Sequence, residues 1–558
     1  MPQPIAYNSG NPISGSIEKS TLSFTVEGAG SDIRDYDGSY AGVNWYSTIP
    51  PQDGKYVIIS ASNPPMIWVT ADETDAELLT TINGLPDRYN QTLFTDTGSA
   101  LDYLAQNAYF VSRETPDQID ADSMVLNLDA SQLSSYPREG STIYDLSGYA
   151  SNGTLINSPT FFNGAIVFDG VDDYVDLGTP SKTNPRLNPG TGDAWSLSSV
   201  FKNSQTLSTQ DDIYGIVGKR VDNSNNGYTL MLRGSGIYNG VLARLSTSGQ
   251  SLVDIVPTTD YSGILSNGRY HQMVMTYGTN DVGILYIDGV LVGQSAAANF
   301  DFNNNTSNFK IGVGDTNNNH PFNGSISNVS FYNKALSLTE VKQNYYGGPI
   351  VTDGLVLAVD AGNLVSYESG STTTYSLTGS LSGSLINGTG YNPQNGGTWT
   401  FDGVDDYIDL GDQSLIENDF CISIWVEADV AKEHFYFSTG YWSAGSILIF
   451  SDGIWINDSQ VNGRLPGAPG TNIGSPMNIT VTRTGSEAKW YKNGIEQGSL
   501  TYSGSIGTGT RYTIGYAIPR NKTSAYLQGK FYTLNIYNKG LTESEVLQNY
   551  NAQKARFI

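Results

Sequence analysis

The chain has 558 residues, a length that predicts three or four domains, and only 15% of these residues are charged. Its 62 glycines and 36 tyrosines are typical of a loop-rich β protein, and its net charge of −25 argues against binding to nucleic acid or to anionic membranes. No apolar run approaches the roughly 18 residues of a membrane span, so we expect no membrane insertion, and the opening residues lack the pattern of a signal peptide. The single cysteine, Cys421, excludes an intrachain disulfide.

Residues 1–122 mix strand and helix patterns and differ from the rest of the chain. Apolar runs at 56–62 and 66–71 predict strands. Residues 71–82 and 99–111 predict helices, the first because acidic side chains in its first turn suit the helix dipole. We therefore expect a small α+β domain, which begins with an extended arm of about 20 residues.

The remaining chain contains one pattern twice. FDGVDDYVDLG at 168–178 and FDGVDDYIDLG at 401–411 are identical at ten of eleven positions. Three further segments match in the same order: MVLNLDASQL with LVLAVDAGNL, WSLSSVFK with FCISIWVE, and SNVSFYNKALSLTEV with YTLNIYNKGLTESEV. Because the order is kept, each copy is predicted to be a whole domain, the first at 123–349 and the second at 350–558.

Within each copy, short apolar runs alternate with Gly, Asn, Asp and Ser, as in antiparallel strands. Asp-Gly at 288–289 and Asn-Gly at 493–494 supply the positive φ that tight hairpins need. Many antiparallel strands within one domain predict two packed sheets, so we expect a β-sandwich in each copy.

Each copy ends in the pattern of a capped helix. Ser337 with Glu340, and Thr542 with Glu545, have the spacing of a capping box, in which the two side chains satisfy free amides of the first turn. Apolar residues four apart follow both boxes and predict one buried helix face. The linker at 346–354 is short, so we expect the two sandwiches to lie close together.

The paired FDGVDDY segments, the YHQMVMTY…LYIDGVLVG hairpin and the FYNKALSLTEV ending resemble the concanavalin A-like jelly rolls, and more narrowly their laminin G-type, pentraxin-like branch. The resemblance covers both copies. It implies a mainly β protein with two tandem concanavalin A-like jelly-roll β-sandwiches after the α+β domain. Residues 126–155 and the opening AYNSGNPISGS also resemble structural proteins of tailed marine bacteriophage virions.

These resemblances imply a non-enzymatic virion protein, which is made in the host cytoplasm and exposed on the particle surface. Residues 1–122 would attach to other virion proteins of the capsid or tail. The two lectin-like sandwiches would form a head decoration or tail-fibre modules, in a homo-oligomer or another symmetric assembly. The first alternative is a tail-fibre adhesin that binds a glycan of the host surface. The second is a glycoside hydrolase, because some members of the family are glycosidases.

The aspartates of the two DGVDDY segments are either ligands of a cation or turn residues. Ca²⁺ prefers about six to eight oxygen ligands, so clustered carboxylates with nearby carbonyls suit it. The alternative is structural, because aspartates cap such turns or face water. Family members carry an acidic residue before the last strand, where this chain has Ser-Asn at 327–328 and Tyr-Thr at 532–533. The missing carboxylate argues against the family's type of calcium site, so the sequence establishes no cofactor and leaves Ca²⁺ as a candidate, with Asp145, Asp172, Asp173, Asp405 and Asp406 as the candidate ligands.

Aromatic residues in Gly/Ser-rich stretches are the candidates for ligand binding. Tyr238 and Trp442 have this setting, in which an exposed ring can stack on a sugar or anchor a protein partner. The alternative is that both rings cover the ends of the sandwiches. Trp195 and Trp425 lie in strand patterns instead and are predicted to be buried.

Glu427, Asp429 and Glu433 form a carboxylate set that could serve glycoside hydrolysis, which needs a pair of acidic groups. Their spacing is wider than in the catalytic jelly rolls, and the first copy has Lys202 at the position of Glu427. We therefore interpret the set as a solvated strand end and expect no enzymatic activity.

Overall fold

We describe the protein from a computed structural model. It describes three short strands before residue 113 and then residues 123–557, with gaps at 180–184, 222–225, 247–251, 304, 316, 394–395, 441–444, 458–461, 507–509 and 518–524. The chain divides into two compact units, Met1–Gln118 and Ile119–Ile558. Within these described ranges, none of the helices has the length and apolar character needed to cross a membrane.

The described part of the first unit is a three-stranded antiparallel sheet. Its strands are β1 (Val57–Ser60), β2 (Ile67–Val69) and β3 (Tyr109–Ser112), in the order β2-β1-β3. The two predicted strands are confirmed. The helix predicted at 99–111 is wrong at its end, because Val111 pairs with Ile58 of β1, and aromatic and β-branched residues favour a strand here. The rest of that helix, the helix predicted at 71–82 and the predicted arm lie outside the described residues.

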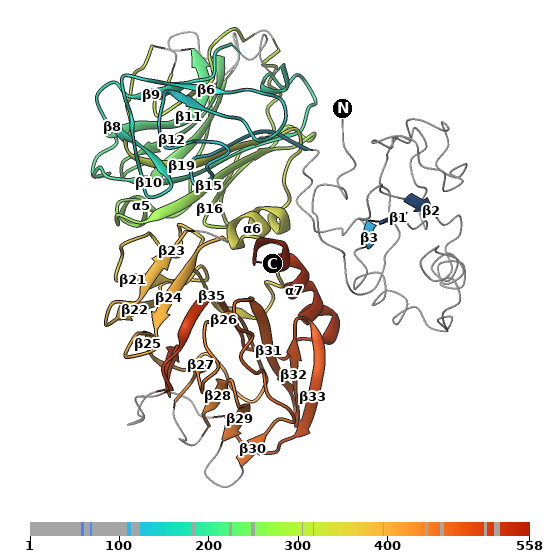
Figure 1. Cartoon of the computed structure of the whole chain (residues 1–558). Helices are drawn as coiled ribbons and strands as arrows, with labels where there is room; N and C mark the ends of the chain where they lie inside the picture. Colours follow the sequence, from blue (N-terminus) through green and yellow to red (C-terminus); the bar gives the residue numbers. More distant parts are fainter. Residues whose placement is uncertain are drawn as a thin grey trace. The chain divides into compact units, whose positions relative to one another are not determined.

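The first copy in the second unit, called sandwich 1, has two antiparallel sheets of eight strands (Figure 1). One sheet has the order β17 (Val290–Gln294), β16 (Gly283–Ile287), β15 (Tyr270–Tyr277), β10 (Trp195–Asn203), β19 (Asn323–Tyr332), β8 (Ala165–Asp169), β7 (Thr160–Phe162), with β4 (Met124–Asp129) also paired to β19. The other has the order β14 (Val253–Ile255), β13 (Gly240–Ser246), β12 (Asn226–Arg233), β11 (Ile213–Val221), β18 (Lys310–Ile311), β9 (Tyr174–Asp176), β6 (Gly153–Ile156), β5 (Thr142–Ile143). The short helices η4 (Pro185–Leu187) and α5 (Ser262–Leu265) lie in its connections.

The second copy, sandwich 2, repeats this topology strand for strand. One sheet has the order β33 (Ile495–Thr501), β32 (Glu487–Lys492), β31 (Met477–Thr484), β26 (Phe420–Ala428), β35 (Gln528–Tyr537), β24 (Thr398–Asp402), β23 (Gly390–Asn392), with β20 (Leu355–Asp360) also paired to β35. The other has the order β30 (Asn462–Arg464), β29 (Gly453–Asn457), β28 (Ile447–Phe450), β27 (Phe435–Ser438), β34 (Thr510–Ile514), β25 (Tyr407–Gln413), β22 (Ser382–Ile386), β21 (Thr373–Tyr375). The predicted duplication of a β-sandwich is confirmed.

Apolar side chains of the two sheets meet in one core within each sandwich. Successive side chains of a strand point to opposite faces of its sheet, so each central strand serves both the core and the outer face. In β10, Trp195 points inward, and its ring stacks on Phe331 at 5.4 Å. In β26, Trp425 points outward and stacks on Tyr550 of the C-terminal helix at 5.6 Å. Both tryptophans are buried as predicted, but only Trp195 lies between the sheets.

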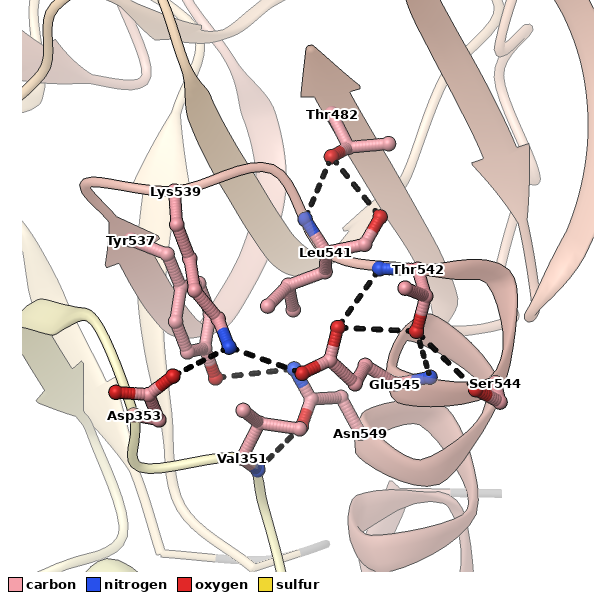
Figure 2. Close-up of polar contacts among 10 residues, drawn as sticks. All are labelled: Val351, Asp353, Thr482, Tyr537, Lys539, Leu541, Thr542, Ser544, Glu545 and Asn549. Carbon is pink, nitrogen blue, oxygen red and sulfur yellow. Dashed lines mark hydrogen bonds and ion pairs between the residues drawn. The ribbon is translucent and has the colours of Figure 1, made fainter. Parts of the chain in front are cut away.

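Both predicted terminal helices form. They are α6 (Leu338–Tyr346) and α7 (Glu543–Phe557). The side chain of Ser337 accepts a hydrogen bond from the amide of Glu340, and the Glu340 carboxylate accepts one from the Ser337 amide. Thr542 and Glu545 make the same reciprocal pair at α7 (Figure 2). Gly347 then ends α6 with a φ of 73°, a left-handed conformation that glycine adopts without strain.

The linker between the sandwiches is fixed to α7 (Figure 2). The amide of Val351 donates a hydrogen bond of 2.7 Å to Oδ1 of Asn549, which is buried. Lys539 Nζ lies 2.7 Å from Asp353 in the linker and 3.0 Å from Glu545 in the capping box of α7. The linker thus follows the surface of sandwich 2 and does not act as a free tether.

The two sandwiches contact each other directly, as predicted from the short linker (Figure 1). Lys202 of β10 forms an ion pair of 2.6 Å with Glu368, and the guanidinium of Arg269 lies 3.7 Å from the centre of the Tyr375 ring. An apolar cluster from both sandwiches is buried beside these pairs: Ala165, Tyr270, Tyr345, Ala358, Val365 and Leu377. Because the contact combines apolar burial with charge pairing, we treat the two sandwiches as one structural body.

Candidate functional site

The first DGVDDY segment forms the turn between β8 and β9, where the chain crosses from one sheet of sandwich 1 to the other. Asp169 Oδ1 accepts a hydrogen bond of 2.8 Å from the amide of Val171. Asp173 Oδ2 accepts one of 3.1 Å from the amide of Asp169. Asn157 Nδ2 donates to the carbonyl of Asp172 and holds the turn from outside. Two of the aspartates therefore act as acceptors for the turn's own amides.

The second segment repeats this geometry between β24 and β25. Asp402 Oδ1 accepts 2.8 Å from the amide of Val404, and Asp406 Oδ2 accepts 3.0 Å from the amide of Asp402. Sandwich 2 adds a cation, because Lys432 Nζ donates to the carbonyl of Gly403 in the same turn. That ammonium group would compete with a metal ion for the negative charge of the turn.

In each turn three carboxylate oxygens lie within 4.8 Å of one another, from Asp169, Asp172 and Asp173 in one and from Asp402, Asp405 and Asp406 in the other. Four of the five predicted ligands therefore lie in these clusters. Burial raises the pKa of Asp173 and of Asp406, and the charges of the neighbouring aspartates raise it further. Each aspartate brings one oxygen to its cluster, and three oxygens are fewer than Ca²⁺ prefers, so further oxygens from the carboxylates, carbonyls or water would have to complete such a site.

Asp145, the fifth predicted ligand, does not belong to either cluster. Its carboxylate accepts hydrogen bonds from the backbone amides of Asn127, Ser147 and Ser151 at 2.9–3.0 Å. Saturated in this way, Asp145 folds the loop that follows β5 and has little capacity left for a cation.

The two aromatic candidates have different outcomes. Tyr238 is half-buried in the turn between β12 and β13, and the guanidinium of Arg233 lies 3.7 Å from the centre of its ring. One face of the ring is thus covered by this cation–π contact, which leaves at most the other face for a ligand. Trp442 lies outside the described residues.

Glu427 is not the solvated strand end that we expected. It is 3% exposed, its Oε1 lies 2.5 Å from Lys530 Nζ, and its Oε2 accepts 2.7 Å from the hydroxyl of Tyr532. The reason is tertiary, because Lys530 and Tyr532 come from β35, the strand paired with β26. Asp429 remains exposed beyond the strand.

A tyrosine cluster in sandwich 2 was missed from the sequence. The rings of Tyr516 and Tyr526 stack at 3.9 Å, and Tyr407 lies 6.0 Å from Tyr516. Tyr407 directly follows the second DGVDD segment, so the tyrosine cluster borders the aspartate cluster of sandwich 2. The repeat pointed to Tyr407, but the other two residues follow β34, more than a hundred positions later, and no local signal joined them to it.

Sandwich 1 has no matching tyrosine cluster among the residues described around its turn. Tyr174 takes the place of Tyr407 there, with Lys310 Nζ 4.6 Å from its ring centre. Beside the tyrosine cluster of sandwich 2, Arg511 instead forms a two-point ion pair with Asp409. The two copies have therefore diverged in the cations that surround the equivalent tyrosines.

The duplicated sandwich, its strand order and its turns agree with a sequence family. The family described as the concanavalin A-like lectin/glucanases superfamily matches residues 169–342 and 402–547, together more than half of the chain. The chain belongs to this superfamily. A comparison with curated proteins gives no match.

Among solved structures, this chain is similar to the binding domain of botulinum neurotoxin serotype D. The identity is 13% and the TM-score is 0.35, and the match covers 76% of this chain and 98% of that one. It is also similar to domain 4 of AbnA, a GH43 extracellular arabinanase of Geobacillus stearothermophilus in complex with arabinotriose, with 19% identity, a TM-score of 0.30, and coverage of 35% and 98%. Domains LG4-5 of the mouse laminin alpha1 chain give 10% identity, a TM-score of 0.24, and coverage of 69% and 93%. The family match, and not these low scores, carries the assignment.

Proposed function

We propose that this chain is a non-enzymatic, lectin-like binding protein on the surface of a bacteriophage particle. The state of Glu427 carries the non-enzymatic part. A general acid or nucleophile of glycoside hydrolysis must reach the sugar, whereas Glu427 is buried on the outer face of its sheet and bound by Lys530 and Tyr532.

The docking of the two sandwiches supports a role as one projecting module. Their contact and the fixed linker keep both domains in one orientation, which suits a component that stands on a particle. Residues 1–122 would attach this module to capsid or tail proteins, in a homo-oligomer or symmetric assembly. Synthesis would take place in the host cytoplasm. The virion-like segment at 126–155 and the opening AYNSGNPISGS support the virion assignment.

Immunogold labelling of purified particles tests the proposal, with antibody raised against residues 123–349. Label over the heads would support a head decoration, and label at the tail end would support a fibre or adhesin. An immunoblot of the infected cells first shows that the full chain is made. If it is made and the particles purified from those cells carry no label, the virion assignment is refuted.

Binding of a host-surface glycan is the second candidate function, and the tyrosine cluster favours it. Tyr407 and Tyr526 are partly exposed, and carboxylates of the neighbouring turn can accept hydrogen bonds from sugar hydroxyls. Aromatic faces beside such polar groups are suited to sugar rings, which have apolar faces and polar edges.

A glycan array probed with the full chain, followed by calorimetric titration of any sugar that binds, tests this candidate. We expect Tyr526→Ala to weaken binding at least tenfold. The matched control is Tyr174→Ala, since Tyr174 occupies the equivalent strand position of Tyr407 in sandwich 1. An equal loss of affinity in both variants would contradict a site at the tyrosine cluster. A titration in the presence of EDTA would show whether sugar binding requires a cation.

A further inference from the structure

Lys219 lies in the interior of sandwich 1. It is in β11, directly opposite Tyr228 of β12, and its side chain points between the two sheets with 0% exposure. Lysines are rarely buried completely, because removing an ammonium group from water is costly unless an acidic partner compensates it. A lysine at this position therefore requires an explanation.

The groups that bind the ammonium of Lys219 are amides. Its Nζ donates hydrogen bonds to Oδ1 of Asn188 and, at 2.5 Å, to the carbonyl oxygen of Asn305. Among the described residues no carboxylate forms an ion pair with it. Burial without a counter-charge lowers the pKa of Lys219 to about 7, so a large share of the amine is neutral near neutral pH. A neutral amine carries the free electron pair of a nucleophile.

Asn188 is held against this amine. It follows η4 directly, is 6% exposed, and its neighbour Leu187 accepts a hydrogen bond of 2.7 Å from the buried hydroxyl of Tyr228. Since Oδ1 is only about 1.2 Å from Cγ, an amine in hydrogen-bond contact with Oδ1 is also close to the carboxamide carbon. The pair is thus pre-positioned by β11 and β12 on one side and by η4 on the other.

We propose that Lys219 and Asn188 join in an intramolecular isopeptide bond. The Nζ electron pair attacks Cγ of Asn188, a C–N bond forms, and the bond from Cγ to Nδ2 breaks. One Nζ proton passes to the departing nitrogen, which leaves as ammonia, so no oxidant, reductant or further reactant is needed. The product is a secondary amide whose carbonyl oxygen keeps the place of Oδ1.

The cross-link would join the chain before β10 to the opposite sheet, across 31 positions of sequence. It would stabilise sandwich 1 by restricting its unfolded state, as a disulfide does, in a chain that has one cysteine. Sandwich 2 lacks the pair. Val217 and Phe437 hold equivalent positions beside β18 and β34, which places Thr439 where sandwich 1 has Lys219.

The test is the intact mass of the denatured full chain, followed by peptide mapping. We expect a mass one ammonia below that of the sequence, and a branched tryptic peptide that joins Lys219 to Asn188 and is not cleaved after Lys219. A measured mass equal to that of the sequence would overturn the proposal. Loss of ammonia mapped elsewhere, for example to a succinimide at the Asn-Gly pairs 387–388 or 493–494, would overturn it equally.

Two variants sharpen the result. Lys219→Met keeps the length of the side chain and must restore the full mass, whereas Lys310→Met, at another buried lysine of sandwich 1, must keep the loss. If Lys219→Met fails to fold, the wild-type peptide map still decides, because it is read on the unfolded chain. The expected physical consequence is that wild-type sandwich 1 unfolds at least tenfold more slowly in urea than the Lys219→Met variant.

Discussion

The ammonium group of Lys202 in sandwich 1 lies 2.6 Å from the carboxylate of Glu368 in sandwich 2. Lys202 holds in β10 the position that Glu427 holds in β26. The two residues point to the same face of equivalent sheets, but Lys202 links the sandwiches while Glu427 binds β35 of its own sheet. One position of the duplicated fold thus has two different structural uses.

We expect Lys202→Met to change the free energy of unfolding by less than about 1 kcal/mol, because both side chains are partly exposed and water screens the pair. A double-mutant cycle with Glu368→Gln in urea measures the coupling. Lys489→Met, which removes a pair inside sandwich 2, is the control. Small-angle scattering should show an unchanged radius of gyration in these variants, because the apolar cluster and the Arg269–Tyr375 contact remain, and a coupling free energy indistinguishable from zero would contradict a stabilising role of the pair.

The second prediction concerns Glu427. Glu427→Ala leaves the buried hydroxyl of Tyr532 without its acceptor and Lys530 without its counter-charge, so we expect a loss of about 1–3 kcal/mol in the free energy of unfolding. Glu427→Gln keeps an acceptor oxygen for the Tyr532 hydroxyl, so we expect a smaller loss in the free energy of unfolding. Urea unfolding followed by tyrosine fluorescence measures both. An alanine variant as stable as the wild type would show that the buried contacts contribute nothing.

The third prediction concerns the contact between β26 and α7. Trp425→Ala removes a ring that packs on Tyr550 and Phe557, so we expect a loss of about 3–5 kcal/mol. Far-ultraviolet circular dichroism and thermal unfolding measure it, with fraying of α7 expected first. Trp455→Ala, at a partly buried ring on the other sheet, is the control and should cost less.

The fourth prediction concerns pH. Burial, and then the charges of Asp402 and Asp405, raise the pKa of Asp406 in the folded chain above its ordinary value of 3.8. The folded state therefore binds this proton more tightly than the unfolded state. The tighter proton binding stabilises the fold fully below pH 3.8, and this stabilisation is lost as the pH rises through the pKa of Asp406 in the folded chain. Asp406→Asn, which carries no charge, should be more stable than the wild type at pH 7 and equally stable at acid pH.

Urea unfolding across pH in the presence of EDTA measures this difference. Asp429→Asn, at an exposed aspartate outside the turn, is the control variant. If the wild type is more stable than Asp406→Asn at pH 7 without metal, the charge of Asp406 does not destabilise the fold, and the prediction fails.

Much of the fold could be predicted from local sequence. The repeated FDGVDDY segments located equivalent turns, and the Ser337–Glu340 and Thr542–Glu545 boxes located both terminal helices. These features depend on hydrogen bonds between residues at most four positions apart, so a short stretch contains all of their partners. For the same reason, the aspartate clusters were found, because their members share one turn.

The sequence alone therefore determined the duplication, the sandwiches and the acidic turns. The tertiary structure decided that Asp145 is used by backbone amides, that Glu427 is buried, and that Tyr407 meets Tyr516 and Tyr526. It also decided that Lys219 meets Asn188 between the sheets. In each case the contact depends on which strands are neighbours and on which face a side chain takes, and the order of strands in a sheet differs from their order in the chain.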